Sequence, residues 1–130
     1  MSPETKEKLG FGLIIFTALL FLGGALGRGP IAQDVSYHLF ADTREIWNIR
    51  NFWNVVSSIP FVIVGYLGLN KLKHSGKLNI LGEMTFAYIL LFFGTFLVGF
   101  GSGYYHLAPD NQTLVWDRLP MTIAFMALFS

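Results

Sequence analysis

The sequence contains no cysteine, and only 13% of its 130 residues are charged. The absence of cysteine excludes a disulfide framework, a thiolate zinc site and a cysteine nucleophile. A soluble domain carries roughly 25% charged residues, so this chain has about half of the usual charge. The net charge of +1 is small and the basic residues form no patch with interleaved aromatic side chains, so we expect no nucleic-acid partner.

Hydrophobic residues make up 53% of the sequence and gather in four runs, at residues 9–27, 51–70, 80–106 and 119–130. A membrane-spanning helix needs roughly 17–25 apolar residues. The first three runs are therefore long enough to cross a bilayer, and the fourth is too short. We predict an all-α, multi-pass integral membrane protein. It is expected to be a polytopic helical bundle with three full spans and the start of a fourth, forming a single membrane domain over residues 1–130.

Lysines indicate how the chain crosses the membrane. Those of the N-terminal tail and of the loop 71–79 lie on the same side, because two crossings separate them. The positive-inside rule makes this side cytoplasmic. The N-terminus is then cytoplasmic, and the loops 28–50 and 107–118 share the opposite face with His106 and Asp117.

Three polar residues stand at the end of the third run. Ionisable side chains beside hydrocarbon are costly, so His106 and Asp117 form a candidate functional site. Ser102 and His106 are four residues apart and therefore share one face of a helix. Asp117 lies across a short loop, three residues before Pro120, where we expect the fourth helix to begin. The spacing predicts three polar groups that converge from two helix ends, an arrangement suited to a metal with a water beside it.

Each of these residues also has a structural interpretation. His106 can donate to a carbonyl at the interface, Ser102 can bond within its own helix, and Asp117 can be a helix N-cap. His38 and Asp42, also four residues apart, can be a solvated surface pair. Alternatively, His38 could complete a metal site in this chain or across a dimer.

The pattern Ser102-x-x-x-His106, then ten residues, then Asp117-x-x-Pro120 resembles the second motif of the CREST superfamily of membrane hydrolases. That group includes alkaline ceramidases, progestin and adipoQ receptors and GPI-remodelling lipases. The run Asn-Phe-Trp-Asn-Val-Val-Ser-Ser, which contains Asn54, is similar to the first-helix motif of the alkaline ceramidases, and Asp-Arg-Leu-Pro-Met resembles their Asp-Glu-Leu-Pro-Met. The resemblance covers about residues 37–130.

The resemblance implies a seven-helix fold with zinc near one membrane face, preceded here by one extra N-terminal helix. His106 would be a zinc ligand, Asp117 would orient or deprotonate the zinc-bound water, and Ser102 would support the developing oxyanion. The implied activity is hydrolysis of ceramide-like N-acyl lipids in the bilayer to a sphingoid base and a fatty acid. The alternative is a non-catalytic receptor or lipid-binding relative in which the same three residues are structural.

Two departures from the family pattern concern metals. The family completes its zinc site with a C-terminal His-x-x-x-His, which this sequence lacks, so the remaining ligands are expected beyond Ser130. In the region of the family's calcium loop, Asp42 and Glu45 are present and could support a second metal with His38. However, the Trp-Cys-Glu-x-Asn pattern is absent and Asn51 replaces the expected Glu, so the sequence does not support calcium binding. The sequence does not indicate the oligomeric state.

Overall fold

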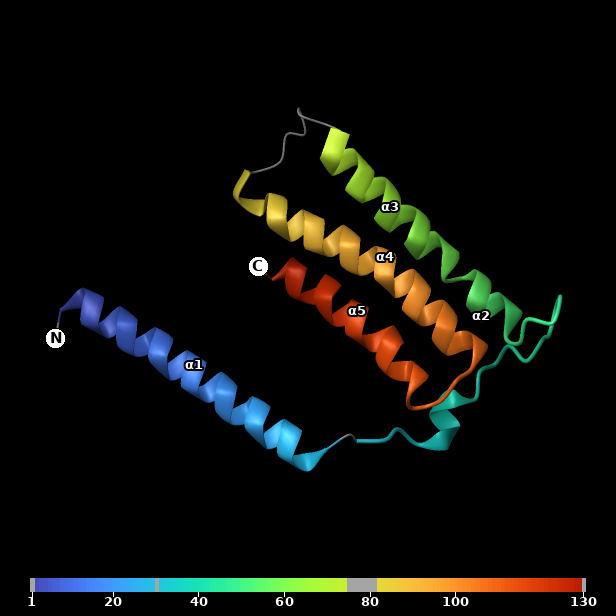
Figure 1. The fold of residues 1–130 in the computed structure, drawn as a ribbon, viewed down its shortest axis with the longest axis horizontal. Coiled ribbons are helices and arrows are strands. Elements are labelled where there is room, and N and C mark those ends of the chain that lie inside the picture. The colour runs from blue at the N-terminus through green and yellow to red at the C-terminus, as the bar shows by residue number, and fades with distance from the viewer. Residues whose placement is uncertain (1, 30, 75–81, 130) are drawn as a thin grey trace. The chain divides into compact units, whose positions relative to one another are not determined.

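The computed structural model describes residues 2–29, 31–74 and 82–129. Its elements are α1 (Pro3–Arg28), η1 (Val35–His38), α2 (Phe52–Val56), α3 (Ile59–His74), η2 (Gly82–Met84), α4 (Thr85–Leu107) and α5 (Thr113–Leu128), where η marks a short 3₁₀ turn (Figure 1). These described ranges contain helices and turns but no strand, which confirms the predicted all-α class. The chain divides into two compact units, Met1–Gln33 and Asp34–Ser130. The single membrane domain stays a prediction.

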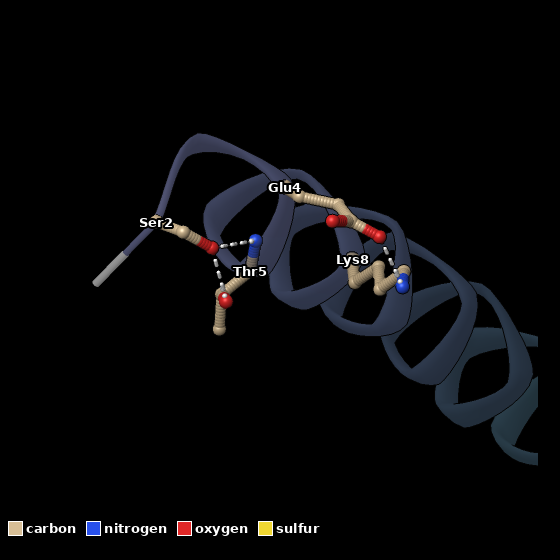
Figure 2. Close-up of polar contacts among 4 residues, drawn as sticks. All are labelled: Ser2, Glu4, Thr5 and Lys8. Atoms are coloured by element: carbon tan, nitrogen blue, oxygen red, sulfur yellow. Dashed lines mark hydrogen bonds and ion pairs between the residues drawn. The ribbon is translucent and has the colours of Figure 1, made fainter.

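The first unit consists mainly of the long helix α1. Ser2 caps its N-terminus, because the Ser2 hydroxyl accepts the Thr5 N–H at 3.2 Å. Glu4 and Lys8 form an ion pair of 2.7 Å one turn further on (Figure 2). The helix then has no charged side chain until its last residue, and none of its residues is buried. Such an apolar surface is typical of a helix covered by lipid.

Three helical segments are long and apolar enough to cross a membrane: Pro3–Arg28, Phe52–His74 and Thr85–Leu107. The three predicted spans are therefore confirmed in the described part of the chain, and their number fits a multi-pass integral membrane protein. Helix α5 (Thr113–Leu128) is shorter than these three segments. The side of the membrane on which each loop lies stays a prediction.

In the second unit, α4 packs between α3 and α5, and the three helices run antiparallel in succession (Figure 1). Glycines make these contacts close. A side chain at Gly65 of α3 would overlap the backbone of Phe96 in α4, and one at Gly94 of α4 would lie 2.8 Å from the backbone nitrogen of Ala124 in α5. Small residues at such positions let membrane helices approach closely.

The second span differs from the predicted run in two ways. It is interrupted between α2 and α3, because Pro60 has no N–H with which to continue the helical hydrogen bonds. The hydroxyls of Ser57 and Ser58 instead donate to the Asn54 carbonyl at 2.7 and 3.3 Å. The span also continues to His74, so the first part of the predicted basic loop is helical.

The third span was predicted to cover residues 80–106, and α4 covers Thr85–Leu107. Residues 80 and 81 lie outside the described residues, and η2 precedes the α-helix. In the polar connection 31–50, the structure has the four-residue turn η1.

The fourth helix begins at Thr113 rather than near Leu119. Asp110 and Thr113 cap it reciprocally, which is why it starts earlier. The Asp110 carboxylate accepts the Thr113 N–H at 2.7 Å, and the Thr113 hydroxyl accepts the Asp110 N–H at 3.1 Å. Asp117 is therefore inside α5, and its interpretation as the helix N-cap is wrong.

Pro120 consequently lies inside α5 and not at its first turn. A proline in a helix interior leaves the carbonyl four residues earlier without its usual N–H partner. Here that carbonyl belongs to Trp116 and faces Gly101 of α4, where any side chain would overlap it. A membrane helix tolerates such a proline because a neighbouring helix covers the freed backbone group.

Candidate active site at the end of α4

Ser102 and His106 lie one turn apart near the C-terminus of α4. Their side chains are hydrogen-bonded, with 3.2 Å between Ser102 Oγ and His106 Nε2. The shared helix face predicted from the four-residue spacing is therefore present. The other ring nitrogen, His106 Nδ1, is buried and has no hydrogen-bond partner among the described residues. The imidazole thus has one nitrogen held by the serine and one available to a further partner.

Asp117 reaches the same region from the second turn of α5. It is only 9% exposed, and its Oδ1 atom has no hydrogen-bond partner within the described ranges. Its backbone lies against the residue before Ser102, because a Cβ at Gly101 would come within 3.3 Å of the Asp117 nitrogen. Buried polar atoms are normally hydrogen-bonded, so an exception is a candidate for a functional role.

The segment that precedes α2 contributes a second polar contact at this end of α4. The imidazole Nδ1 of His38 and the hydroxyl of Tyr105 are hydrogen-bonded at 2.9 Å. The ring of Phe40 packs in a T-shaped arrangement against both Tyr105 and His106, with its centroid 5.5 Å from Tyr105 and 4.9 Å from His106. Tyr105 is only 3% exposed. Its polar partner is far away in the sequence and could not be inferred from local spacing.

The other predicted site residues have different surroundings. Both carboxylate oxygens of Asp42 accept hydrogen bonds, Oδ1 from Arg44 and Oδ2 from the Trp53 N–H. Glu45 is exposed, and Asn54 is half-buried in α2. In the described part of the chain, no group of three or more His, Cys, Asp or Glu side chains could hold a metal ion. A second metal site with His38 and these acids stays a prediction.

An apolar cavity of about 420 Å³ lies beside the Ser102–His106 pair. Its walls come from the turn before α3 and from α3, α4 and α5, and they are mainly aliphatic and aromatic: Ser57, Ser58, Phe61, Leu91, Thr95, Val98, Ser102, His106, Met121, Ala124, Phe125 and Leu128. Ligand sites of this kind combine an apolar surface with a few polar groups that fix orientation. This cavity has that composition, with its histidine and serines as the polar groups.

Zinc, the metal implied by the motif, fits these residues as part of a ligand set. Catalytic zinc is held by three protein ligands with a water in the fourth position. His106 offers an imidazole nitrogen, and Asp117 offers a buried carboxylate oxygen of the kind that orients groups around a metal. The described residues alone do not supply three ligands.

A protein-family model described as Ceramidase matches residues 46–130 of the chain. The chain belongs to the ceramidase family. The matched region of this ceramidase-family chain contains α2 to α5 and all three residues of the candidate site. A search of curated proteins and a search of solved structures found no significant match. Family membership supports a hydrolase that acts on amides and a lipid substrate in a membrane.

Proposed function

We propose that this chain carries the reactive site of a zinc-dependent membrane amidase. It would cleave the N-acyl bond of ceramide-like lipids to give a sphingoid base and a fatty acid. The observation that carries the proposal is the hydrogen-bonded Ser102–His106 pair beside the buried Asp117 carboxylate. On both His106 and Asp117, a buried polar atom is without a hydrogen-bond partner among the described residues.

Each residue has a role that its chemistry allows. His106 contributes one imidazole ligand to the metal. When bound, zinc lowers the pKa of a water toward about 7 and polarises the amide carbonyl. Asp117 accepts the proton of the attacking water, and Ser102 donates its hydroxyl to the oxyanion that develops on the carbonyl. As the water oxygen bonds to the carbonyl carbon and the C–N bond breaks, the proton held by Asp117 passes to the leaving amine.

The cavity supports a lipid as the substrate. An acyl chain in it would lie against the aliphatic walls between α3, α4 and α5, beside the polar groups at His106. Lipid tails are as apolar as these walls, so an acyl chain can move from the bilayer into the cavity without exposing its methylene groups to water. The same walls offer few hydrogen-bond partners to the successive backbone amides of a peptide. They therefore favour an N-acyl lipid, whose chain is hydrocarbon, over a peptide.

The test is the substitution His106→Ala in the full-length protein purified in detergent. We expect loss of bound zinc and of ceramide hydrolysis. His74→Ala is a matched control, because His74 is exposed at the other end of α3 and its Nδ1 pairs with the Asn70 carbonyl. Unchanged zinc content and unchanged hydrolysis in His106→Ala would refute the proposal.

Asp117→Asn separates this function from a receptor or lipid-binding role. The hydrolase predicts a loss of turnover of at least about 100-fold, since general acid–base catalysis contributes that much. A structural role instead predicts lower stability with turnover unchanged. Hydrolysis rate and detergent unfolding of the same sample distinguish the two outcomes.

A further inference from the structure

The last turn of α4, which carries His106, has carbonyl groups without helical partners. Pro109 has no N–H to offer the Tyr105 carbonyl. The Asp110 N–H would meet the His106 carbonyl if the helix continued, but it donates to the Thr113 hydroxyl at 3.1 Å. The carbonyl of His106 therefore needs a donor from another part of the chain.

Asn51 supplies this donor. Its side-chain Nδ2 donates to the His106 carbonyl at 2.9 Å, in a part-buried contact between residues 55 positions apart. The bond joins the start of α2 to the end of α4. It acts on the backbone of the same residue whose imidazole pairs with Ser102.

The local structure frees Asn51 for this contact. Asn51 is the N-cap of α2, and an asparagine there usually accepts an N–H of its own helix, but the Asn51 side chain makes no such bond. The first N–H groups of α2 have other partners. Asp42 accepts the Trp53 N–H at 2.9 Å, and the Arg44 carbonyl accepts the Phe52 N–H at 3.1 Å.

The backbone at Asn51 also restricts which residue can serve. Its φ is 50° and its ψ is 43°, the left-handed region that asparagine and glycine adopt most readily. Glycine has no side chain, and aspartate has the right size but, when ionised, only acceptor atoms. Asparagine therefore combines the required conformation with the required donor.

We infer that Asn51 is a positioning residue for the hydrolysis proposed above. Its amide fixes the last turn of α4 and with it the direction of the His106 imidazole relative to Asp117. Catalytic groups must be held within about 0.5 Å of their productive geometry by the residues that support them. The inference rests on the proposed function, because it assigns Asn51 a role in that reaction.

The experiment compares Asn51→Gly and Asn51→Asp in the full-length protein. Asn51→Gly keeps the left-handed backbone conformation and removes the side-chain donor. Asn51→Asp keeps the size of the side chain but presents an acceptor to the His106 carbonyl. Loss of residues that orient a metal ligand lowers activity by about 10- to 100-fold. We expect kcat for ceramide hydrolysis to fall by at least about tenfold, with KM changed by less than about twofold.

Asn48→Gly is the control, because Asn48 has the same kind of backbone conformation, with a φ of 62°, and is exposed. Its kcat should equal that of the wild type. Undiminished kcat in both Asn51 variants overturns the inference and leaves the proposed function in place. A wild type that hydrolyses no ceramide instead overturns the proposed function itself.

A second readout needs no activity. With ¹³C-carbonyl-labelled histidine, the His106 carbonyl resonance should shift in Asn51→Gly and stay in place in Asn48→Gly. Hydrogen exchange of the Leu107 and Ala108 amides should also accelerate by about tenfold in the Asn51 variants, since the end of the helix then frays. Unchanged resonances and exchange rates overturn the contact on which the inference depends.

Discussion

Gly101 is the position at which α4 meets the backbone of α5 before Pro120. An alanine Cβ at this position would lie 2.7 Å from the Trp116 carbonyl carbon and 3.3 Å from the Asp117 nitrogen, where ordinary contact begins at 3.4 Å. The obstacle is backbone, so no side-chain rotation can relieve it. Gly101→Ala must therefore push the two helices apart.

The expected size of the effect follows from where this separation occurs. Overpacking of a close contact lowers the free energy of unfolding by about 1–3 kcal/mol. Ser102 follows Gly101 directly and Asp117 follows Trp116, so the displacement falls between the proposed catalytic groups. A shift of about 1 Å in such groups lowers the rate about 100-fold. We expect a decrease of that order in kcat/KM for ceramide.

Gly103→Ala is the matched control in the same helix. Its Cβ would meet only Ser58 Cβ, at 3.8 Å, which is ordinary contact. Alanine is favoured over glycine in a helix by about 0.5–1 kcal/mol, so this variant should keep its stability and its activity. Unfolding in detergent and ceramide hydrolysis are measured for both variants. The reasoning is refuted if both alanines behave alike, or if Gly101→Ala keeps the wild-type rate and stability.

Two further predictions concern the loop and the contact beside the site. Hydrogen bonds from Thr113 hold the pKa of Asp110 below its ordinary 3.8, and they outweigh the opposing effect of burial. The stability that this carboxylate contributes is therefore complete above pH 3.8. It is lost as the pH falls through the lower pKa of the folded state. The unfolding temperature of the wild type should fall more steeply than that of Asp110→Asn between about pH 5 and pH 2, and parallel curves would contradict this. Tyr105→Phe leaves the Nδ1 atom of His38 without its partner, so it should lower the free energy of unfolding by about 1–2 kcal/mol. A double-mutant cycle with His38→Phe should give a coupling of about 1 kcal/mol, whereas additive losses would count against the hydrogen bond.

The part of the site that lies within one helix could be predicted from the sequence. Ser102 and His106 are separated by one helical turn, so their side chains meet wherever that segment is helical. The three long spans were predictable for a similar reason, because hydrophobic length alone decides whether a helix can cross a bilayer.

The contacts that depend on helix ends could not be predicted in the same way. Pro120 suggested a helix start, since proline is common at the first helical position. The reciprocal cap of Asp110 and Thr113 instead begins the helix earlier, at Thr113. The bond from Asn51 to the His106 carbonyl joins distant segments, and the local pattern predicts only a cap for α2.

The Ser102–His106 hydrogen bond lies within one helix, and this has a consequence for how the site is assembled during synthesis. Helices inserted into a bilayer form their internal bonds before they associate with one another. The serine–histidine pair can therefore exist as soon as α4 has entered the membrane, before α5 has left the ribosome. Asp117 joins only when the next helix docks, so a nascent chain holds two of its three proposed reactive groups in place before the third arrives. The step that brings Asp117 to this pair is the docking of α5 against the glycines of α4.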